Sequence, residues 1–197
     1  SEYPAAYDIL GGAISEARAA GIVGQPAFGS SFSCEARIVQ GRGAYICGEE
    51  TSLLRSIEGV PALVSIRPPF PAHEGLWGCP TAVQNVETLH NLPWIVANGG
   101  EAYARYGLGD SRGTKAVSLN TRVARPGLYE VELGTTLNEI IFGLAGGMAD
   151  GEEFKAVQIG GPLGSILGPE ALDAPFSFEG LTEAGGILGH GGIVVYS

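Results

Sequence analysis

Two adjacent carboxylates at the end of a glycine-bracketed loop are the first feature that could bind a cofactor. Residues 43–51 read GAYICGEET, with Glu49 and Glu50 at the start of an expected helix. Glycine lets the backbone approach a flat ligand or a phosphate closely, and carboxylates can accept hydrogen bonds from ribose or ribityl hydroxyls. An ordinary turn into a helix has the same composition, because the helix dipole favours acidic side chains in the first turn. Taken alone, this stretch favours the ordinary turn.

A second stretch, residues 78–89, reads GCPTAVQNVETL and carries uncharged hydrogen-bonding side chains where another helix should begin. Thr81, Gln84 and Asn85 lie just before or within its first turn. A helix N-terminus has unsatisfied amides and partial positive charge, so it can hold a phosphate or an amide-rich ring. The alternative is that Thr81 simply caps the helix.

Composition excludes several other classes of function. The net charge is −10 and the 11 Lys and Arg residues are scattered, which argues against a nucleic-acid partner. No run approaches the ~18–20 apolar residues of a membrane helix, and the first residues lack the pattern of a signal peptide. We therefore expect a soluble, cytoplasmic protein with no direct membrane insertion. The 32 glycines among 197 residues indicate many tight turns.

The cysteines and histidines do not form a recognisable catalytic or metal site. The three cysteines lack Cys-x-x-Cys spacing, which predicts reduced thiols and no metal site. The three histidines have no obvious paired nucleophile, so we expect structural roles for them and no catalytic side chain. No Gly-x-x-x-x-Gly-Lys-Ser/Thr motif is present. These residues are Cys34, Cys47, Cys79, His73, His90 and His190.

The elements that must position the two stretches follow from hydrophobic periodicity. Helices are expected over 4–20, 49–57 and 83–97, and a strand over 32–39. The proline-rich segment 61–80 should be a stiff loop. The apolar stripes predicted to face inward are Ile9, Leu10, Ala13, Ile14 and Ala17 in the first helix, Leu53, Leu54 and Ile57 in the second, and Val86, Leu89, Leu92 and Ile95 or Val96 in the third. Pro93 predicts a kink or an early end in that third helix.

The pattern changes after the polar, glycine-rich tract 98–114. Strands are expected over 115–123, 127–133, 154–159 and 192–196, with a helix from Thr135 or Thr136 to Leu144 closed by two glycines. Strand, hairpin, strand, helix, strand is the order of a β-grasp (ubiquitin-like) module. The predicted fold class is therefore α/β, in two domains, with residues 1–114 followed by an α+β β-grasp domain over 115–197.

Taken together, the motifs resemble one family. YICGEET, RPPFPA and CPTxVxNVETL occur in that order and close spacing, at 45–51, 67–72 and 79–89. This is similar to the 51-kDa-type flavoprotein subunit of respiratory complex I, shared with NAD-dependent formate dehydrogenases and NAD-reducing hydrogenases. NGGEAY and PGLYEV also match. The ending, with QIGGPLG and LGHGGIVV, looks more like the β subunit of a formate dehydrogenase.

The resemblance implies a site for FMN and NAD(H), in which a hydride passes between the two and electrons then move singly through iron–sulfur clusters. A carboxylate at 49 or 50 would lie near the nucleotide ribose and disfavour a 2′-phosphate, which implies NAD over NADP. The family usually has Asn where this chain has Gln84. The implied cofactor contacts are Tyr45, Gly48, Glu49, Glu50, Thr81, Val83, Gln84 and Asn85.

Two parts of the family pattern are not found in these residues: the glycine-rich flavin-phosphate loop with its lysine, and the Cys-x-x-Cys-x-x-Cys ligands. The resemblance therefore implies a fragment, in which residues 1–114 are the C-terminal half of the FMN/NADH-binding domain, a partial α/β sandwich. We expect weak or no flavin binding and diaphorase activity from it alone, with the 4Fe–4S cluster in the full-length subunit and outside this chain. The implied partners are a 24-kDa-type 2Fe–2S subunit and a large molybdenum- or cluster-containing catalytic subunit. The main alternative is a non-catalytic β-grasp module that binds a ligand or docks a subunit, and a third is a structural scaffold.

Overall fold

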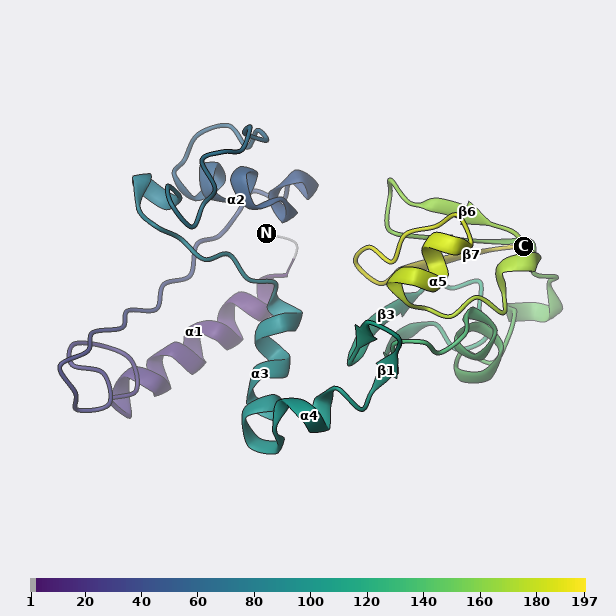
Figure 1. Ribbon diagram of the computed structural model, residues 1–197, viewed down its shortest axis with the longest axis horizontal. Helices are drawn as coiled ribbons and strands as arrows, with labels where there is room; N and C mark the ends of the chain where they lie inside the picture. The colour runs from purple at the N-terminus through teal and green to yellow at the C-terminus, as the bar shows by residue number, and fades with distance from the viewer. Residues whose placement is uncertain (1–2) are drawn as a thin grey trace. The chain divides into compact units, whose positions relative to one another are not determined.

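The computed structural model describes residues 3–197, and the chain forms two compact units, Ser1–Gln84 and Asn85–Ser197 (Figure 1). The units divide inside the second stretch identified above, so Gln84 belongs to the first and Asn85 to the second. The predicted domains, 1–114 and 115–197, place their boundary 30 residues later, and that division stays a prediction.

The first unit is built from helices and long irregular connections. Its elements are α1 (Pro4–Ala19), the 3₁₀ turn η1 (Tyr45–Gly48), α2 (Glu50–Ile57) and the short turn η2 (Leu76–Gly78). The helices predicted over 4–20 and 49–57 are confirmed, with Pro4 in the first turn of α1 as expected.

The strand predicted over 32–39 is wrong. Among the described residues of the first unit, this segment forms one isolated bridge, between Gly24 and Cys34. Alternation of apolar and polar residues makes a segment compatible with a strand, but a strand exists only where a second segment pairs with its backbone. Residues 35–43 have no such pairing and run as an irregular connection into η1.

The predicted burial of the helix faces is right for α2 and wrong for α1. Leu54 is buried in α2, with Leu53 and Ile57 half-buried. No residue of α1 is buried, and Ile9 is 71% exposed. An apolar stripe identifies the face that a helix can bury, and burial itself needs a second element against that face.

The second unit begins with helices and a small hairpin. Its first elements are α3 (Val86–Asn98), α4 (Gly100–Tyr103), β1 (Gly107–Leu108) and β2 (Ser111–Arg112). Pro93 does not end α3, which continues for five residues beyond it. The apolar face predicted to point inward is largely exposed, with Val86 79% and Val96 83% exposed.

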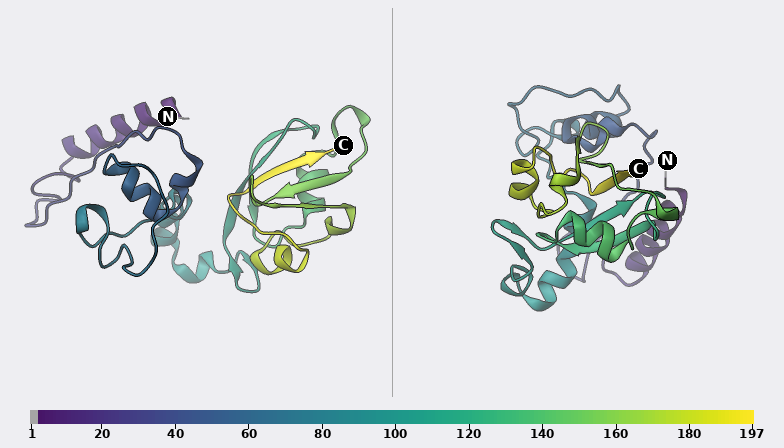
Figure 2. Two further views of the ribbon diagram at one scale, coloured as in Figure 1. Left: turned by 90° about the horizontal axis from the view of Figure 1, so that it is seen from above. Right: turned by 90° about the vertical axis from the view of Figure 1, so that its right-hand side faces the viewer.

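A mixed five-stranded sheet forms the centre of the second unit. The order is β4-β3-β7-β5-β6, in which β7 runs parallel to β3 and antiparallel to β5, and the outer pairs are antiparallel. In Figure 2 the yellow strand β7 lies beside the green strand β5. The strands are β3 (Thr114–Leu119), β4 (Gly127–Glu132), β5 (Ala156–Ile159), β6 (Ser165–Leu167) and β7 (Gly192–Tyr196).

Short helices complete the core of this unit. The helical segment after Thr136 includes a π-helical stretch, η3 (Glu139–Leu144), and its start has a capping box: Glu139 N donates to Thr136 Oγ1 at 3.2 Å, and Thr136 N donates to Glu139 Oε2 at 2.9 Å. The 3₁₀ turns η4 (Ala149–Gly151) and η5 (Pro169–Ala171) and the helix α5 (Phe178–Glu183) follow. The hydrophobic core cluster lies entirely between Val117 and Val195. No helix among residues 3–197 is long and apolar enough to cross a membrane.

Candidate functional site

The carboxylate of Glu49 organises the turn from η1 into α2. As the N-cap of α2, its Oε2 accepts hydrogen bonds from Ser52 N at 2.9 Å and from Thr51 Oγ1 at 2.5 Å. These two donors, the Thr51 hydroxyl first, hold the pKa of Glu49 below its ordinary value. The other oxygen, Oε1, is buried and has no hydrogen-bond partner among the described residues. Glu49 therefore has one oxygen committed to the fold and one still able to accept.

The neighbouring groups tie α2 to the proline-rich loop. Thr51 Oγ1 accepts from Ser65 N at 2.9 Å, and Arg67 Nη1 pairs with Glu50 Oε1 at 2.5 Å. Both partners of this ion pair are about a third or more exposed, so it contributes about 0–1 kcal/mol. Glu50 therefore has a structural partner within its own unit.

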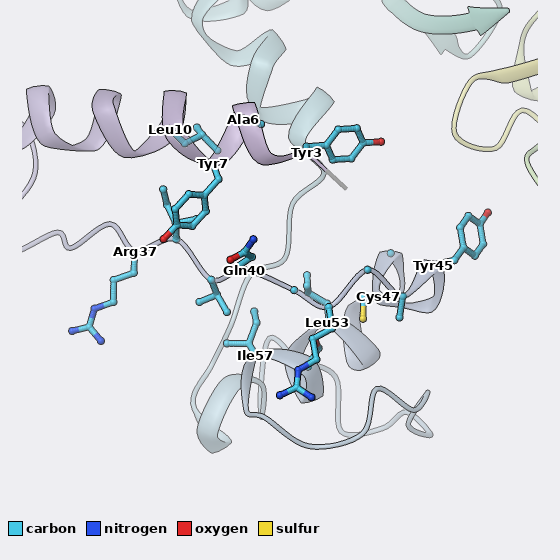
Figure 3. Close-up of a pocket in the computed structure, with 18 residues that line it drawn as sticks. Tyr3, Ala6, Tyr7, Leu10, Arg37, Gln40, Tyr45, Cys47, Leu53 and Ile57 are labelled. Carbon is cyan, nitrogen blue, oxygen red and sulfur yellow. The ribbon is translucent and has the colours of Figure 1, made fainter. Parts of the chain in front are cut away.

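A cavity of about 710 Å³ lies beside this turn, between α1, α2 and the connection 37–45 (Figure 3). Tyr45 and Gly48, two of the predicted contacts, line it. Arg37 and Arg42 also line it, and sequence reasoning did not single them out. The sequence feature that could have identified them is their position on either side of Gly41. Arginine near a glycine in a loop can bind an anionic group, because the glycine lets the backbone approach it.

The second stretch adopts a different local structure from the predicted one. Thr81 closes a loop and does not cap a helix: its Oγ1 accepts from Leu76 N at 2.9 Å and donates to Cys79 O at 2.9 Å. The helix begins three residues later than the predicted start, at Val86, and Asn85 is its N-cap, with Oδ1 accepting from Glu87 N at 3.1 Å. The local sequence offers several capping residues, and loop closure decides between them.

Two of the predicted contacts lie together within the first unit. Tyr45 and Gly48 share the cavity beside α1 and α2, while Glu49 and Glu50 adjoin them in sequence and are bonded to α2 and the loop. Val83 is half-buried and Gln84 is exposed. Among the described residues, no group of three or more His, Cys, Asp or Glu side chains could hold a metal ion. The contact residues that do not line the cavity are Glu49, Glu50, Thr81, Val83, Gln84 and Asn85.

Comparison with known proteins gives a consistent result. Residues 1–94 match the family described as the Nuo51 FMN-binding domain. The chain is 44% identical over 195 residues to the NADP-reducing hydrogenase subunit HndC of Solidesulfovibrio fructosivorans, covering 99% of this chain and 40% of that protein. It is 47% identical over 188 residues to a subunit of the NADH-quinone oxidoreductase of Escherichia coli, covering 95% of this chain and 42% of the relative.

A solved structure has the same fold. The crystal structure of an NAD⁺-reducing [NiFe]-hydrogenase in the air-oxidized state superposes with a TM-score of 0.73 and 38% identity, over 84% of this chain and 28% of the hydrogenase chain. This match confirms the mixed α/β fold class. The chain spans about two fifths of the length of the curated relatives that it matches. Residues 1–94 are thus similar to the Nuo51 FMN-binding domain family, and nearly the whole chain is similar to subunits of the hydrogenase and of the NADH-quinone oxidoreductase named above.

Proposed function

We propose that the chain is the flavin-holding part of an oxidoreductase subunit in which a hydride passes between NAD(H) and FMN. The observation that carries this proposal is the cavity of about 710 Å³ beside Tyr45 and Gly48, within the residues that match the FMN-binding domain family. Its volume is within the ~300–1,000 Å³ typical of sites for small molecules and cofactors.

The residues present fit a flavin mononucleotide. Gly41 and Gly48 line the cavity with open space where a Cβ would lie, so their backbone can approach a flat ring. Arg37 and Arg42 supply positive charge for a phosphate.

The role of the chain is binding and orientation. FMN, when bound, supplies the exchange of a hydride with nicotinamide and of single electrons with iron–sulfur clusters. None of the side chains around the cavity needs to act as a general acid or base, because the reaction requires placement of the two rings. Tyr45, Leu53 and Ile57 line the cavity, and their part is to hold the flavin ring and exclude water from it.

We also propose a preference for NAD over NADP, carried by the negative charge of Glu49 or Glu50, which would repel a 2′-phosphate. One relative is named as a subunit of an NADP-reducing hydrogenase, HndC. The preference between NAD and NADP therefore has to be measured for this chain. The test compares NADH and NADPH oxidation by the full-length subunit and its Glu49→Gln and Glu50→Gln variants. An unchanged ratio in both variants would rule out this role.

The finer assignment rests on the resemblance of the sequence. We propose a subunit of an NAD-dependent formate dehydrogenase, with a 4Fe–4S cluster elsewhere in the full-length subunit. Its partners would be a 24-kDa-type 2Fe–2S subunit and a large molybdenum- or cluster-containing subunit. For residues 115–197 we propose a β-grasp domain. The strand order β4-β3-β7-β5-β6, with β3 and β7 parallel, supports this proposal.

A second candidate function is a non-catalytic ligand-binding or subunit-docking module. It is favoured by the location of the hydrophobic core cluster, which lies entirely within the second unit. A unit with its own core can bind a partner whether or not flavin is bound elsewhere.

The decisive test is FMN titration by fluorescence quenching, with this chain and with a version extended to the full length of its relatives. We expect the extended protein to bind FMN and oxidise NADH, and Gly48→Val to weaken binding at least about tenfold by filling the cavity wall. Gly12→Val is the matched control, because Gly12 has open space around it and does not line the cavity. If neither protein binds FMN, the docking module is the better account.

A further inference from the structure

A second cavity, of about 410 Å³, lies within the Asn85–Ser197 unit and has no role in the proposed flavin chemistry. Its walls come from α3, α4, the segment that follows α4, and strands β3 and β4. Three aromatic side chains line it: Trp94, Tyr103 and Tyr106. The ring of Trp94 lies 5.9 Å, centroid to centroid, from each of the two tyrosine rings, so the three form one continuous aromatic wall.

Two carboxylates line the same cavity. Glu130 and Glu132 are two residues apart on β4 and therefore lie on the same face of the strand. Each has one oxygen held in place, since Glu130 Oε1 accepts from Thr114 Oγ1 at 2.6 Å and Glu132 Oε1 accepts from Gly107 N at 2.8 Å. Within residues 3–197, none of the ion pairs involves either carboxylate. Two negative charges are thus held in position without an ion-pair partner among the described residues, and the imidazole of His90 also lines the cavity.

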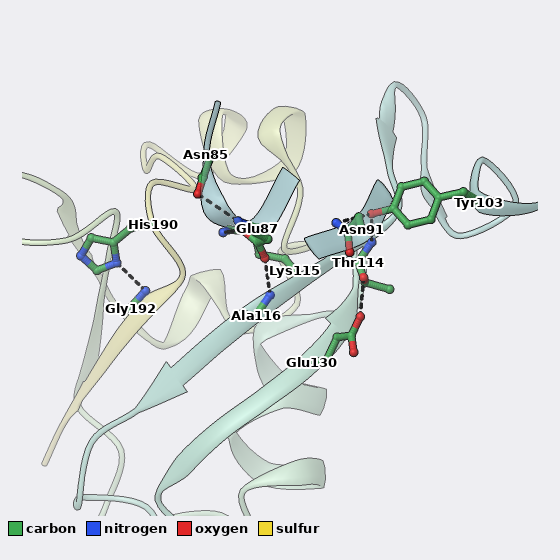
Figure 4. A network of polar contacts seen from close by, with 10 residues as sticks. All are labelled: Asn85, Glu87, Asn91, Tyr103, Thr114, Lys115, Ala116, Glu130, His190 and Gly192. Carbon is green, nitrogen blue, oxygen red and sulfur yellow. Dashed lines mark hydrogen bonds and ion pairs between the residues drawn. The ribbon is translucent and has the colours of Figure 1, made fainter. Parts of the chain in front are cut away.

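The wall between the rings and the carboxylates is held rigidly by neutral hydrogen bonds. Asn91 Nδ2 donates to Tyr103 Oη at 2.9 Å, and Thr114 N donates to the same oxygen at 3.4 Å. Figure 4 shows Asn91, Tyr103, Thr114 and Glu130 converging at this place between α3 and the sheet. These hydrogen bonds join α3, α4 and β3 and hold the Tyr103 ring at the cavity.

Aromatic rings beside fixed carboxylates recognise a particular chemistry. The faces of the rings attract organic cations, and carboxylates pair with guanidinium and ammonium groups. Phosphates and carboxylates are disfavoured by the two glutamates and by the net charge of −10. We propose that this cavity is a binding site for a small organic cation, an alkylguanidinium or alkylammonium compound, separate from the flavin site.

The test is a titration of the chain with methylguanidinium and with methylammonium, followed by NMR shifts of the Trp94 indole N–H and of the β4 amides. Methylurea is the neutral control of the same shape, and sodium chloride at equal ionic strength controls for screening. Both cations should give saturable shifts confined to the cavity. We expect Glu130→Gln/Glu132→Gln to weaken binding at least about tenfold, because both charged partners are lost.

The double variant should fold normally, because a glutamine oxygen can still accept the hydrogen bonds from Thr114 and Gly107. Glu153→Gln/Glu183→Gln is the matched control: it removes the same charge from two exposed residues that do not line the cavity. The proposal is overturned if methylurea binds as well as the cations, if sodium chloride reproduces the shifts, or if the two double variants bind the cations equally.

Discussion

Glu49 combines a structural bond with an unused acceptor, and its titration reports on both. Its pKa is lowered by the Thr51 hydroxyl and the Ser52 amide, so its ionised form stabilises the fold above the ordinary value of 4.5, and this contribution is lost as the pH falls through the lowered pKa. Thr51→Val should raise the pKa of Glu49, so that this loss begins at a higher pH. Carbon-13 NMR of the side-chain carboxyl measures the change, with Thr182→Val as the control. An unchanged titration curve would show that the Thr51 hydroxyl has no such effect.

Gly75 is the residue at which the loop before the second stretch tolerates no side chain. A Cβ there would overlap Thr81 Cβ and would lie 2.8 Å from Pro71 O. We therefore expect Gly75→Ala to lower the free energy of unfolding by about 1–3 kcal/mol. Gly11→Ala, in open space within α1, should raise it by about 0.5–1 kcal/mol. Urea denaturation compares the two, and a similar change in both would refute the steric argument.

At the scale of elements, Glu87 fastens the first turn of α3 to strand β3. Its carboxylate pairs with Lys115 through Oε2 and accepts from Ala116 N at 2.8 Å through Oε1 (Figure 4). Glu87→Ala leaves the largely buried ammonium of Lys115 and the backbone amide of Ala116 unpaired. We therefore expect it to lower the free energy of unfolding by about 2–4 kcal/mol. Lys115→Met leaves the hydrogen bond from Ala116 N to Glu87 intact. We expect it to lower the free energy of unfolding by about 1–2 kcal/mol.

A double-mutant cycle of these two substitutions, measured by chemical denaturation, should give a coupling energy of about 0.5–2 kcal/mol. If the two changes in the free energy of unfolding simply add, the ion pair contributes nothing. The hydrogen bond from Ala116 N to Glu87 would then be what joins α3 to β3. The interactions of Glu87 with Lys115 and Ala116 also hold the start of α3, where Asn85 is the N-cap. The predicted contact of Asn85 with flavin depends on where this helix begins.

The elements also show how far sequence reasoning reaches. Periodicity and turn residues predicted α1, α2 and four strands of the large sheet, because these depend on local pattern. The false strand at 32–39 and the exposed faces of α1 and α3 have one cause, since pairing and burial require a second segment that no local pattern specifies. Strand β6 and helix α5 are short and lie in glycine-rich sequence, so their periodicity is too brief to detect.

The same limit applies to the candidate site. The GEE motif predicted the turn at Glu49, and its role as the N-cap of α2 follows from the helix dipole and the local spacing. Arg37 and Arg42 reach the cavity through an irregular connection, and neither periodicity nor capping rules describe such a segment. A cavity wall made from three separate segments is a tertiary property.

At the scale of the whole molecule, the two units differ in how much core they contain. Among residues 3–84, the buried hydrophobic side chains of the core are Ala27 and Leu54, whereas the core cluster of the second unit runs from Val117 to Val195. Local stability follows buried apolar contacts. The first unit should therefore unfold locally more readily than the second. A ligand that binds the first unit should reduce this local unfolding.

Hydrogen exchange tests this difference and the flavin proposal together. Without ligand, amides of β3, β5 and β7 should exchange far more slowly than those of α2. FMN at a concentration of about 100 times its Kd should add ~2.7 kcal/mol to the unit that binds it, slowing α2 exchange about 100-fold when opening of that unit limits it. The sheet amides serve as the internal control and should not change. Slowing confined to the sheet amides would place flavin binding on the second unit, equal slowing in both units would contradict binding to the first unit alone, and uniform protection without FMN would contradict the difference in core.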